Sequence, residues 1–362
     1  MQKAYLKLKD GTIFSGILHG KANVCGEVVF NTSMTGYPEI LTDPSYNGQI
    51  VVMTYPLIGN YGVDKYEKES SGIKATALIV KKLYRGPLPE GKTSLEEYMS
   101  KADMPILEGI DTRALTLHLR DNGSQNGVIY LEGMEAEADK ILSTFPKITE
   151  RDLISEVAVD KVTQAPNLSE GFVAPPTNPT LKAAVVDYGI KYSIIDDLYQ
   201  RNCAVTLFPP TFKAEDVLDK GYDLLFLSNG PGDPALLTQS VEEIKKCLKK
   251  IPIRGICLGH QLLTLALGGK TVKMDFGHHG GNQPVKDMIT GKTFVTSQNH
   301  GFMSDEKTLP SEVLVWMRNA NDNSVEGIIS KENNVKSVQF HPEASPGPHD
   351  KNDIFDEFLK EL

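Results

Sequence analysis

The sequence holds few cysteines: four among 362 residues, with no Cys-x-x-Cys spacing between any two of them. This pattern argues against a zinc site and against a framework of disulfides. The chain also lacks a basic run, and its formal net charge is -9, which disfavours nucleic acid as a partner. No apolar stretch is as long as a membrane span, which needs about 18 or more such residues. The first residues lack the apolar core of a signal peptide, so we expect a cytoplasmic protein with no membrane partner.

What remains is an ordinary globular composition, with 40% hydrophobic and 23% charged residues. A chain of this length should form two domains, each large enough for its own core. We place the first domain at residues 1–150 and the second at residues 181–362. Between them, residues 151–180 are rich in Pro, Asn, Ser and Thr and are expected to form a linker.

The first domain shows short alternating apolar segments and is expected to be a smaller, β-rich α+β domain. Residues 6–9 and 12–14 flank Asp10-Gly11, which is typical of a β-hairpin. Further strands are expected at residues 26–30, 49–53, 75–80 and 128–131, and helices at residues 94–102, 111–120 and 136–144. A polar, turn-rich loop over residues 31–47 joins two of these strands, and a loop of that length is more often functional than filler.

In the second domain, apolar strands alternate with helices from residue 182 onward. This alternation predicts an α/β fold, a doubly wound and mostly parallel sheet with helices on both faces. Strands are expected at residues 183–187, 203–208, 222–227, 251–254 and 335–340, and helices at residues 189–202, 214–220, 235–250 and 262–267. Active sites in such sheets gather at the carboxyl ends of the strands.

Residues 255–261 read Gly-Ile-Cys-Leu-Gly-His-Gln and stand between a predicted strand and a predicted helix. Glycines on both sides of Cys257 are typical of a nucleophile elbow, whose sharp turn leaves no room for side chains. The turn places the thiol at a helix N-terminus, where the partial positive charge favours thiolate. The N–H of Leu258 is then positioned as an oxyanion donor. A lone Cys in an apolar segment is usually inert, but the flanking glycines favour a nucleophile.

A cysteine nucleophile needs a base and a group that orients the base. His341-Pro342-Glu343 follows the last predicted strand and would bring an imidazole and a carboxylate to the sheet edge that carries the elbow. His260 lies three residues after Cys257 and is expected to pack or to form hydrogen bonds. Metal binding by the adjacent His278 and His279 is an alternative that no carboxylate or Cys spacing supports.

The segment Ser-Asn-Gly-Pro-Gly-Asp-Pro at residues 228–234 follows another predicted strand. Gly230 and Gly232 allow a close approach of the backbone, and an N–H of this loop is a candidate for the second oxyanion donor. By itself the segment is an ordinary turn. The chain contains neither a dinucleotide-binding fingerprint nor a P-loop.

These three segments resemble those of the class I (triad) glutamine amidotransferases. Additional segments resemble the small, glutamine-hydrolysing subunits of carbamoyl-phosphate synthetases, and they lie at residues 34–39, 43–46, 111–113, 276–282, 298–302 and 343–350. The resemblance covers nearly the full length, including the N-terminal domain that other amidotransferases of this class lack.

The resemblance implies a role for each matching residue. Cys257 would be the nucleophile, His341 its base and Glu343 the orienting carboxylate. The positions that match the glutamine site, with Gly230 and Leu258 forming the oxyanion hole, are Ser45, Gly230, Gly232, Leu258, Gln261, Asn299, Gly301 and Phe302. Ser45 would reach this site from the N-terminal domain, in keeping with the tendency of ligand sites to form at domain interfaces.

The resemblance also implies the reaction. The chain would hydrolyse L-glutamine through a thioester and pass ammonia through a channel to a large subunit, which makes carbamoyl phosphate from bicarbonate and ATP. We expect no cofactor or metal in this chain, with ATP and Mg bound by the large subunit, in a heterodimer or a higher oligomer. Two alternatives stay open: a stand-alone γ-glutamyl cysteine hydrolase, and a regulatory subunit with a vestigial site. The sequence does not distinguish arginine from pyrimidine synthesis as the destination of the product.

Overall fold

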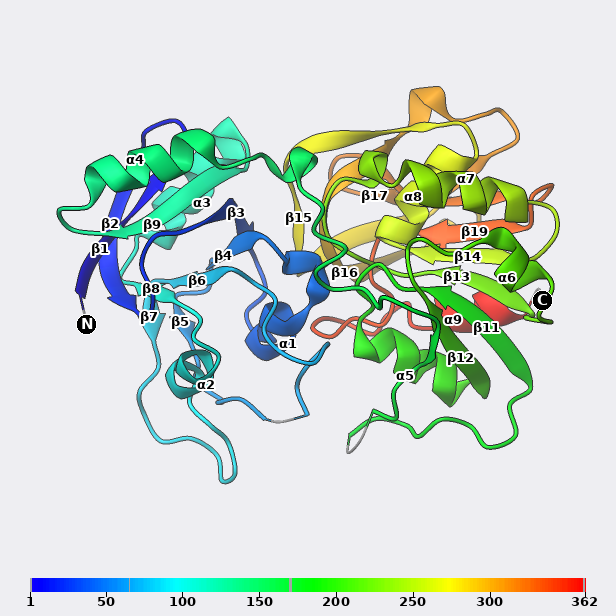
Figure 1. The fold of residues 1–362 in the computed structure, drawn as a ribbon, viewed down its shortest axis with the longest axis horizontal. Helices are drawn as coiled ribbons and strands as arrows, with labels where there is room; N and C mark the ends of the chain where they lie inside the picture. Colours follow the sequence, from blue (N-terminus) through cyan, green and yellow to red (C-terminus); the bar gives the residue numbers. More distant parts are fainter. Residues whose placement is uncertain (1, 65, 169–170, 361) are drawn as a thin grey trace. The chain divides into compact units, whose positions relative to one another are not determined.

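The computed structural model describes residues 2–64, 66–168, 171–360 and 362. The chain folds into two compact units, shown in Figure 1. The first comprises Met1–Arg151 and Asp275–His279, and the second comprises Asp152–Met274 and Gly280–Leu362. Residues 152–180 therefore group with the second unit, and a short internal segment far along the chain completes the first.

The first unit is built on a closed sheet with strand order β1-β2-β8-β6-β4-β3-β9. Its strands are β1 Gln2–Leu8, β2 Ile13–His19, β3 Val24–Asn31, β4 Gln49–Met53, β6 Ala77–Val80, β8 Ile106–Glu108 and β9 Gln125–Leu131, with a separate pair β5 Leu57–Ile58 and β7 Lys82–Leu83. Its helices are α1 Tyr37–Thr42, α2 Leu95–Lys101, α3 Thr112–Asn122 and α4 Glu135–Thr144, with short 3-10 turns η1 Pro44–Tyr46 and η2 Ile148–Glu150. The expected β-rich α+β character is confirmed.

Local sequence signals account for several of these elements. The expected hairpin forms between β1 and β2, which pair antiparallel with Lys7 opposite Ile13. Helix α3 begins after Asp111, whose side chain accepts a hydrogen bond from the N–H of Ala114 at 3.0 Å, as an N-cap residue should. The expected loop at residues 31–47 instead contains α1 and η1, because local hydrogen bonds and a Pro at the start of each convert the polar stretch into helical turns.

The second unit carries a sheet with strand order β10-β12-β11-β13-β14-β19-β18-β17-β15-β16. The central strands from β12 to β19 pair in parallel, and β18 and β17 continue the sheet antiparallel. Its strands are β10 Thr163–Gln164, β11 Leu181–Val186, β12 Cys203–Phe208, β13 Leu224–Leu227, β14 Ile253–Ile256, β15 Lys270–Asp287, β16 Thr293–Asp305, β17 Leu314–Asn319, β18 Val325–Ser330 and β19 Val335–Val338. The mostly parallel, doubly wound α/β sheet is therefore confirmed.

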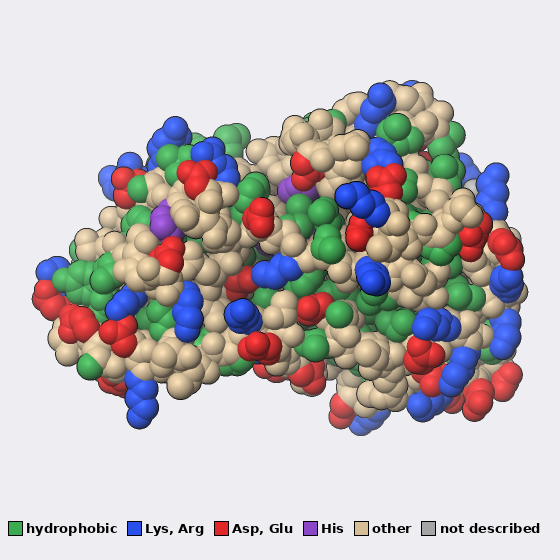
Figure 2. Space-filling model, turned by 90° about the horizontal axis from the view of Figure 1, so that it is seen from above, with side chains coloured by type: hydrophobic (Ala, Val, Ile, Leu, Met, Phe, Trp, Pro, Cys, Tyr) green, Lys and Arg blue, Asp and Glu red, His purple; other side chains and the backbone are tan. Residues whose placement is uncertain are grey.

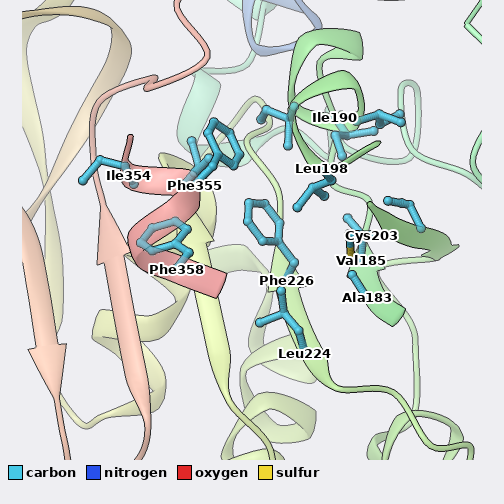
Figure 3. Close-up of a cluster of buried hydrophobic side chains, with 14 of the residues drawn as sticks. Ala183, Val185, Ile190, Leu198, Cys203, Leu224, Phe226, Ile354, Phe355 and Phe358 are labelled. Carbon is cyan, nitrogen blue, oxygen red and sulfur yellow. The ribbon is translucent and has the colours of Figure 1, made fainter. Parts of the chain in front are cut away.

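Helices cover both faces of this sheet. They are α5 Tyr192–Gln200, α6 Ala214–Leu218, α7 Thr238–Cys247, α8 Leu258–Ala266 and α9 Ile354–Leu359, with short 3-10 turns η3 Pro234–Leu236 and η4 Glu306–Thr308. Helices α5 and α9 pack on one face, where Phe355 and Phe358 surround Phe226 of β13 together with Leu198 (Figure 3). Helices α6, α7 and α8 pack on the other face. Each fully buried aromatic or aliphatic side chain stabilises such a core by about 1.5–3 kcal/mol.

The surface carries interspersed charges. On the face shown in Figure 2, lysines and arginines alternate with acidic side chains over each unit, and neither sign forms a broad patch. Within the described residues, no helix combines the length and the apolar character that a membrane span requires.

Candidate active site

The turn between β14 and α8 holds Cys257 in a strained backbone conformation. Cys257 is the N-cap residue of α8, with φ 54° and ψ -104°, outside the regions that L-residues usually adopt. Strain of this kind costs about 1–3 kcal/mol and persists where the surrounding structure enforces it. The expected elbow geometry is therefore present: a strand, a sharp turn at the cysteine, and a helix.

Two glycines make this turn sterically feasible. A Cβ atom on Gly259 would lie 2.2 Å from the carbonyl oxygen of Leu227, and one on Gly255 would lie 2.8 Å from the carbonyl carbon of Gly259. The N–H of Gly259 also donates to the carbonyl of Ser228 at 3.0 Å. Helix α8 thus begins in direct contact with the end of β13, and any larger residue at either glycine would push the elbow away.

The four cysteines differ in their surroundings. Cys257 is 2% exposed, and its Sγ lies 3.6 Å from the carbonyl oxygen of Asn299 on β16. The other three are free and buried. Burial raises the pKa of the Cys25 and Cys203 thiols to about 12 and that of Cys247 to about 11, so these thiols stay protonated and inert at neutral pH.

His341 and Glu343 lie shortly after the end of β19 and contact each other. Nδ1 of His341 lies 2.6 Å from Oε1 of Glu343, and because a carboxylate can only accept, Nδ1 carries the hydrogen. Among the described residues, Nε2 of His341 is buried without a hydrogen-bond partner, so it is the nitrogen available to take a proton. The backbone N–H of His341 donates to the carbonyl of Ser297 at 2.9 Å, which holds the end of the strand.

The charges around His341 favour its protonated form. Burial alone would lower the pKa of His341, but the charges of Glu343 and Cys257 raise it to about 10. This influence of Cys257 requires the sulfur and the imidazole to be close neighbours. A thiolate paired with an imidazolium is the reactive form of a cysteine nucleophile.

Lys191 is a member of this site that the sequence reasoning missed. Its Nζ lies 3.1 Å from Oε1 of Glu343 and donates to the carbonyl of Ala344 at 2.7 Å. Burial alone would raise the pKa of Glu343, but Lys191 and His341 lower it to about 2. The carboxylate is therefore ionised at any physiological pH. A lysine at the carboxyl end of β11, in the otherwise apolar start of α5, was the signal that could have revealed it.

The loop after β13 approaches the elbow closely. A Cβ atom on Gly230 would lie 2.3 Å from the carbonyl oxygen of Tyr188, so this position requires glycine. Gly232, in the same loop, has φ 84°, a conformation that favours glycine. The N–H groups of Gly230 and Leu258 donate to none of the turn and loop carbonyls among the described residues. Both are suited to bind an oxyanion, and that role stays a prediction.

Besides Leu258, four of the residues assigned to glutamine by resemblance lie on α8 and β16: Gln261, Asn299, Gly301 and Phe302. Nε2 of Gln261 donates to the carbonyl of Phe302 at 2.9 Å and to Oε1 of Gln339 at 3.1 Å. The carbonyl of Asn299 contacts the thiol, and a Cβ atom on Gly301 would meet nothing within 4 Å. The structure thus brings these residues together beside Cys257. Their contacts with a substrate stay a prediction.

Two other residues have different surroundings. Ser45 lies in the first unit, on η1, where its N–H donates to Oδ1 of Asp43 at 2.8 Å, and its role in binding glutamine stays a prediction. His260 uses both ring nitrogens, Nδ1 with Ser337 at 2.9 Å and Nε2 with Ser304 at 3.0 Å. Burial lowers the pKa of His260 to about 3, so it is neutral and packs by hydrogen bonding, as expected.

Known proteins resemble this chain over nearly its whole length. The family model "Glutamine amidotransferase class-I" matches residues 184–361, and "Carbamoyl-phosphate synthase small chain, CPSase domain" matches residues 6–129. The carbamoyl phosphate synthase small chain of Clostridium perfringens is 47% identical over 99% of this chain and 99% of its own length. That of Syntrophotalea carbinolica is 46% identical over 98% and 96%, and that of Archaeoglobus fulgidus is 45% identical over 99% of each chain. With this identity over nearly its whole length, the chain belongs to the carbamoyl phosphate synthase small chain family.

Proposed function

We propose that this chain is the glutaminase subunit of a glutamine-dependent carbamoyl phosphate synthase, and that it acts through a triad of Cys257, His341 and Glu343. The observation that carries the proposal is the strained elbow cysteine beside a buried histidine whose Nδ1 is held by a carboxylate. Family membership supports the coarser role, and the arrangement of the side chains supports the assignment of each step.

In the first step, the thiolate of Cys257 attacks the carboxamide carbon of glutamine. The carbonyl π electrons move to the oxygen, and the N–H groups of Gly230 and Leu258 would stabilise the resulting oxyanion. His341 holds the proton that left the thiol, and Glu343 stabilises the imidazolium. Apart from the Cys257 sulfur, no group among the described residues competes for the proton on Nε2 of His341.

In the second step, His341 gives this proton to the departing nitrogen, which leaves as ammonia while the carbonyl re-forms as a thioester. A water molecule then attacks the thioester, His341 takes its proton, and glutamate leaves as the thiolate is restored. Lys191 takes no proton in this scheme. It keeps Glu343 ionised, so that Nδ1 of His341 always faces a negative charge.

The partner in this proposal is the large subunit. It would receive the ammonia through a channel and combine it with bicarbonate, using ATP and Mg, so this chain itself needs no cofactor. A cytoplasmic location suits the site, because a reducing compartment keeps the Cys257 thiol free.

The test is a glutaminase assay on the purified chain, with and without a co-purified large chain and its substrates. We expect weak hydrolysis by the chain alone and a rise of at least about tenfold in the complex. Equal turnover in both states would indicate the stand-alone γ-glutamyl hydrolase instead. No turnover in either state would indicate a regulatory subunit with a vestigial site.

A further inference from the structure

The segment that follows the triad is held by the side chain of Asn352. Nδ2 of Asn352 lies 3.0 and 3.1 Å from the two carboxylate oxygens of Asp197. The same nitrogen lies 3.4 Å from the carbonyl oxygen of Pro342, the residue between His341 and Glu343. One amide therefore connects helix α5 with the turn that sets the distance between the base and its orienting carboxylate.

Arg201 fixes both partners of this contact. Its Nη1 donates to Oδ1 of Asp197 at 2.7 Å, and its Nη2 donates to Oδ1 of Asn352 at 2.9 Å. The guanidinium also lies over the ring of Phe355 on α9, 5.2 Å from the ring centre. With five fixed donors, an arginine of this kind holds two side chains in one geometry.

Helix α5 thus connects to the triad segment at two points along the helix. Lys191, at its N-terminal end, binds Glu343 and Ala344, and Asp197, further along the helix, reaches Pro342 through Asn352. The helix is anchored to the sheet by the apolar cluster around Leu198 (Figure 3). A rigid helix with two attachment points on one turn restricts both the position and the tilt of that turn.

We propose that Asp197, Arg201 and Asn352 form a positioning cluster that holds the Pro342 turn, and thereby keeps Nδ1 of His341 directed at Glu343 during glutamine hydrolysis. The inference rests on the proposed function. It adds three residues that touch neither substrate nor the reacting atoms, and it gives a role to a buried carboxylate that the triad itself does not use.

The cluster contains a titratable group. Burial raises the pKa of Asp197 to about 6, against the lowering effects of Asn352 and Arg201, and the charge of Glu343 also raises it. The charged groups that face Asp197 are Arg201 on its own helix and Glu343 beyond β19. Helix α9 contributes Asp356, which contacts Arg201 at 2.9 Å. Acidification through pH 6 therefore neutralises Asp197 and weakens its hold on Asn352.

The first test uses the wild-type complex and Asn352→Ala. The variant loses the amide that reaches Pro342 while Asp197 and Arg201 stay paired. We expect kcat for glutamine hydrolysis to fall about tenfold with KM within about twofold, because the triad is misplaced and the glutamine-binding residues are untouched. Asp356→Ala is the matched control, since it removes the outer contact of Arg201 and should leave kcat unchanged. An unchanged kcat in Asn352→Ala would overturn the proposal.

A second test separates positioning from simple loss of stability. The double variant Asp197→Asn/Asn352→Asp exchanges carboxylate and amide, so Arg201 keeps a carboxylate partner, but residue 352 can no longer donate to Pro342. We expect its melting temperature to exceed that of Asn352→Asp alone while kcat stays low. Recovery of kcat together with the melting temperature would show that the cluster is merely structural.

The pH profile gives a third readout through Asp197→Asn. Because the wild-type carboxylate becomes neutral in acid, the ratio of wild-type to variant kcat should be about threefold or more at pH 8 and approach one below pH 6. A ratio that is constant across this range would contradict the proposal. A wild-type complex that releases no ammonia from glutamine would refute the proposed function itself, whatever the variants do.

Discussion

The ammonium group of Lys191 lies 3.1 Å from Oε1 of Glu343, the same oxygen that receives Nδ1–H of His341 at 2.6 Å. One carboxylate oxygen therefore serves two cations, and all three side chains are buried. The arrangement balances charge: Glu343 offsets Lys191, and the imidazolium of His341 can be offset by the thiolate of Cys257. Removal of any one member leaves an uncompensated charge in a dry environment.

Lys191→Met should therefore damage both stability and turnover. Loss of one partner of a buried ion pair costs about 3–5 kcal/mol of unfolding free energy, and a Glu343 that is no longer held ionised orients His341 poorly. We expect at least about a tenfold loss of kcat for glutamine. Urea denaturation and a glutaminase assay check the two effects. Lys245→Gln, which removes a cation from an ion pair that is exposed on both sides, is the control, and equal behaviour of the two variants would contradict the role of Lys191.

Glu343→Gln should keep the shape of the site and remove the charge that orients His341. We expect kcat to fall at least about tenfold with a smaller change in KM, because Glu343 stabilises and orients the imidazolium that gives its proton to the departing nitrogen. His341→Asn should be worse, since it removes the base. Steady-state kinetics of the complex provide the measurement, with Glu332→Gln at an exposed ion pair as control. Wild-type kinetics in Glu343→Gln would show that its assigned role is wrong.

The difference in unfolding free energy between wild type and Glu343→Gln should depend on pH. The pKa of His341 is raised from 6.5 to about 10, so its contribution is fully present below pH 6.5 and is lost as the pH rises through 10. The pKa of Glu343 is lowered from 4.5 to about 2, so its contribution is present above pH 4.5 and is lost as the pH falls through 2. The stability gap between wild type and Glu343→Gln should thus be largest near pH 5.5 and shrink toward pH 10. Denaturation at both pH values measures it, and a gap that widens toward pH 10 would reject the assignment.

Cys257→Ser tests whether this chain releases ammonia from glutamine while the large subunit makes carbamoyl phosphate. A serine hydroxyl stays neutral near pH 7 and cannot form the ion pair with His341, so we expect loss of glutamine-dependent carbamoyl phosphate synthesis. Synthesis from ammonium salt should persist, because it bypasses the thioester. Both reactions are measured in the reconstituted complex. Persistence of the glutamine reaction would mean that Cys257 is not the nucleophile.

Gly259→Ala should disturb the elbow by overpacking. Its Cβ would lie 2.2 Å from the carbonyl oxygen of Leu227, and such insertions cost about 1–3 kcal/mol. Displacement of α8 should also abolish most glutaminase activity. Thermal unfolding and the assay check both effects. Gly72→Ala is the matched control, since its Cβ would meet nothing within 4 Å, and a loss of stability in that variant equal to that of Gly259→Ala would contradict the steric explanation.

Much of the second unit could be predicted from the sequence, because its signals are local. The elbow could be predicted from one short segment, because strand β14, the glycines around Cys257 and helix α8 follow one another directly. The placement of His341 and Glu343 needed one further step, the rule that parallel strands bring their carboxyl ends to one edge. Strands β15 to β18 were not predicted, since they join this sheet antiparallel and have no regular alternation with helices.

The contacts that were missed are tertiary. The apolar residues around Lys191 mark it as unusual, but they do not indicate that its ammonium group will meet Glu343, which lies far along the chain. Nor do the residues around Asp197 and Asn352 indicate their contacts. Asp and Asn are common on exposed helices and loops, so the residue types alone predict no role. Their contacts form when α5 and α9 pack on the same face of the sheet.

The first unit depends on residues 275–279, which follow it in the sequence by more than a hundred positions. In that unit the N–H of Ser124 donates to the carbonyl of Asp275, the N–H of Thr32 donates to the carbonyl of His279, and Phe30 stacks on Phe276. During translation, a nascent chain that has emerged only to residue 151 therefore lacks part of its first unit. On the ribosome, the first unit therefore stays incomplete until residue 279 has left the exit tunnel. A gene fragment that ends at residue 151 would encode a first unit without residues 275–279.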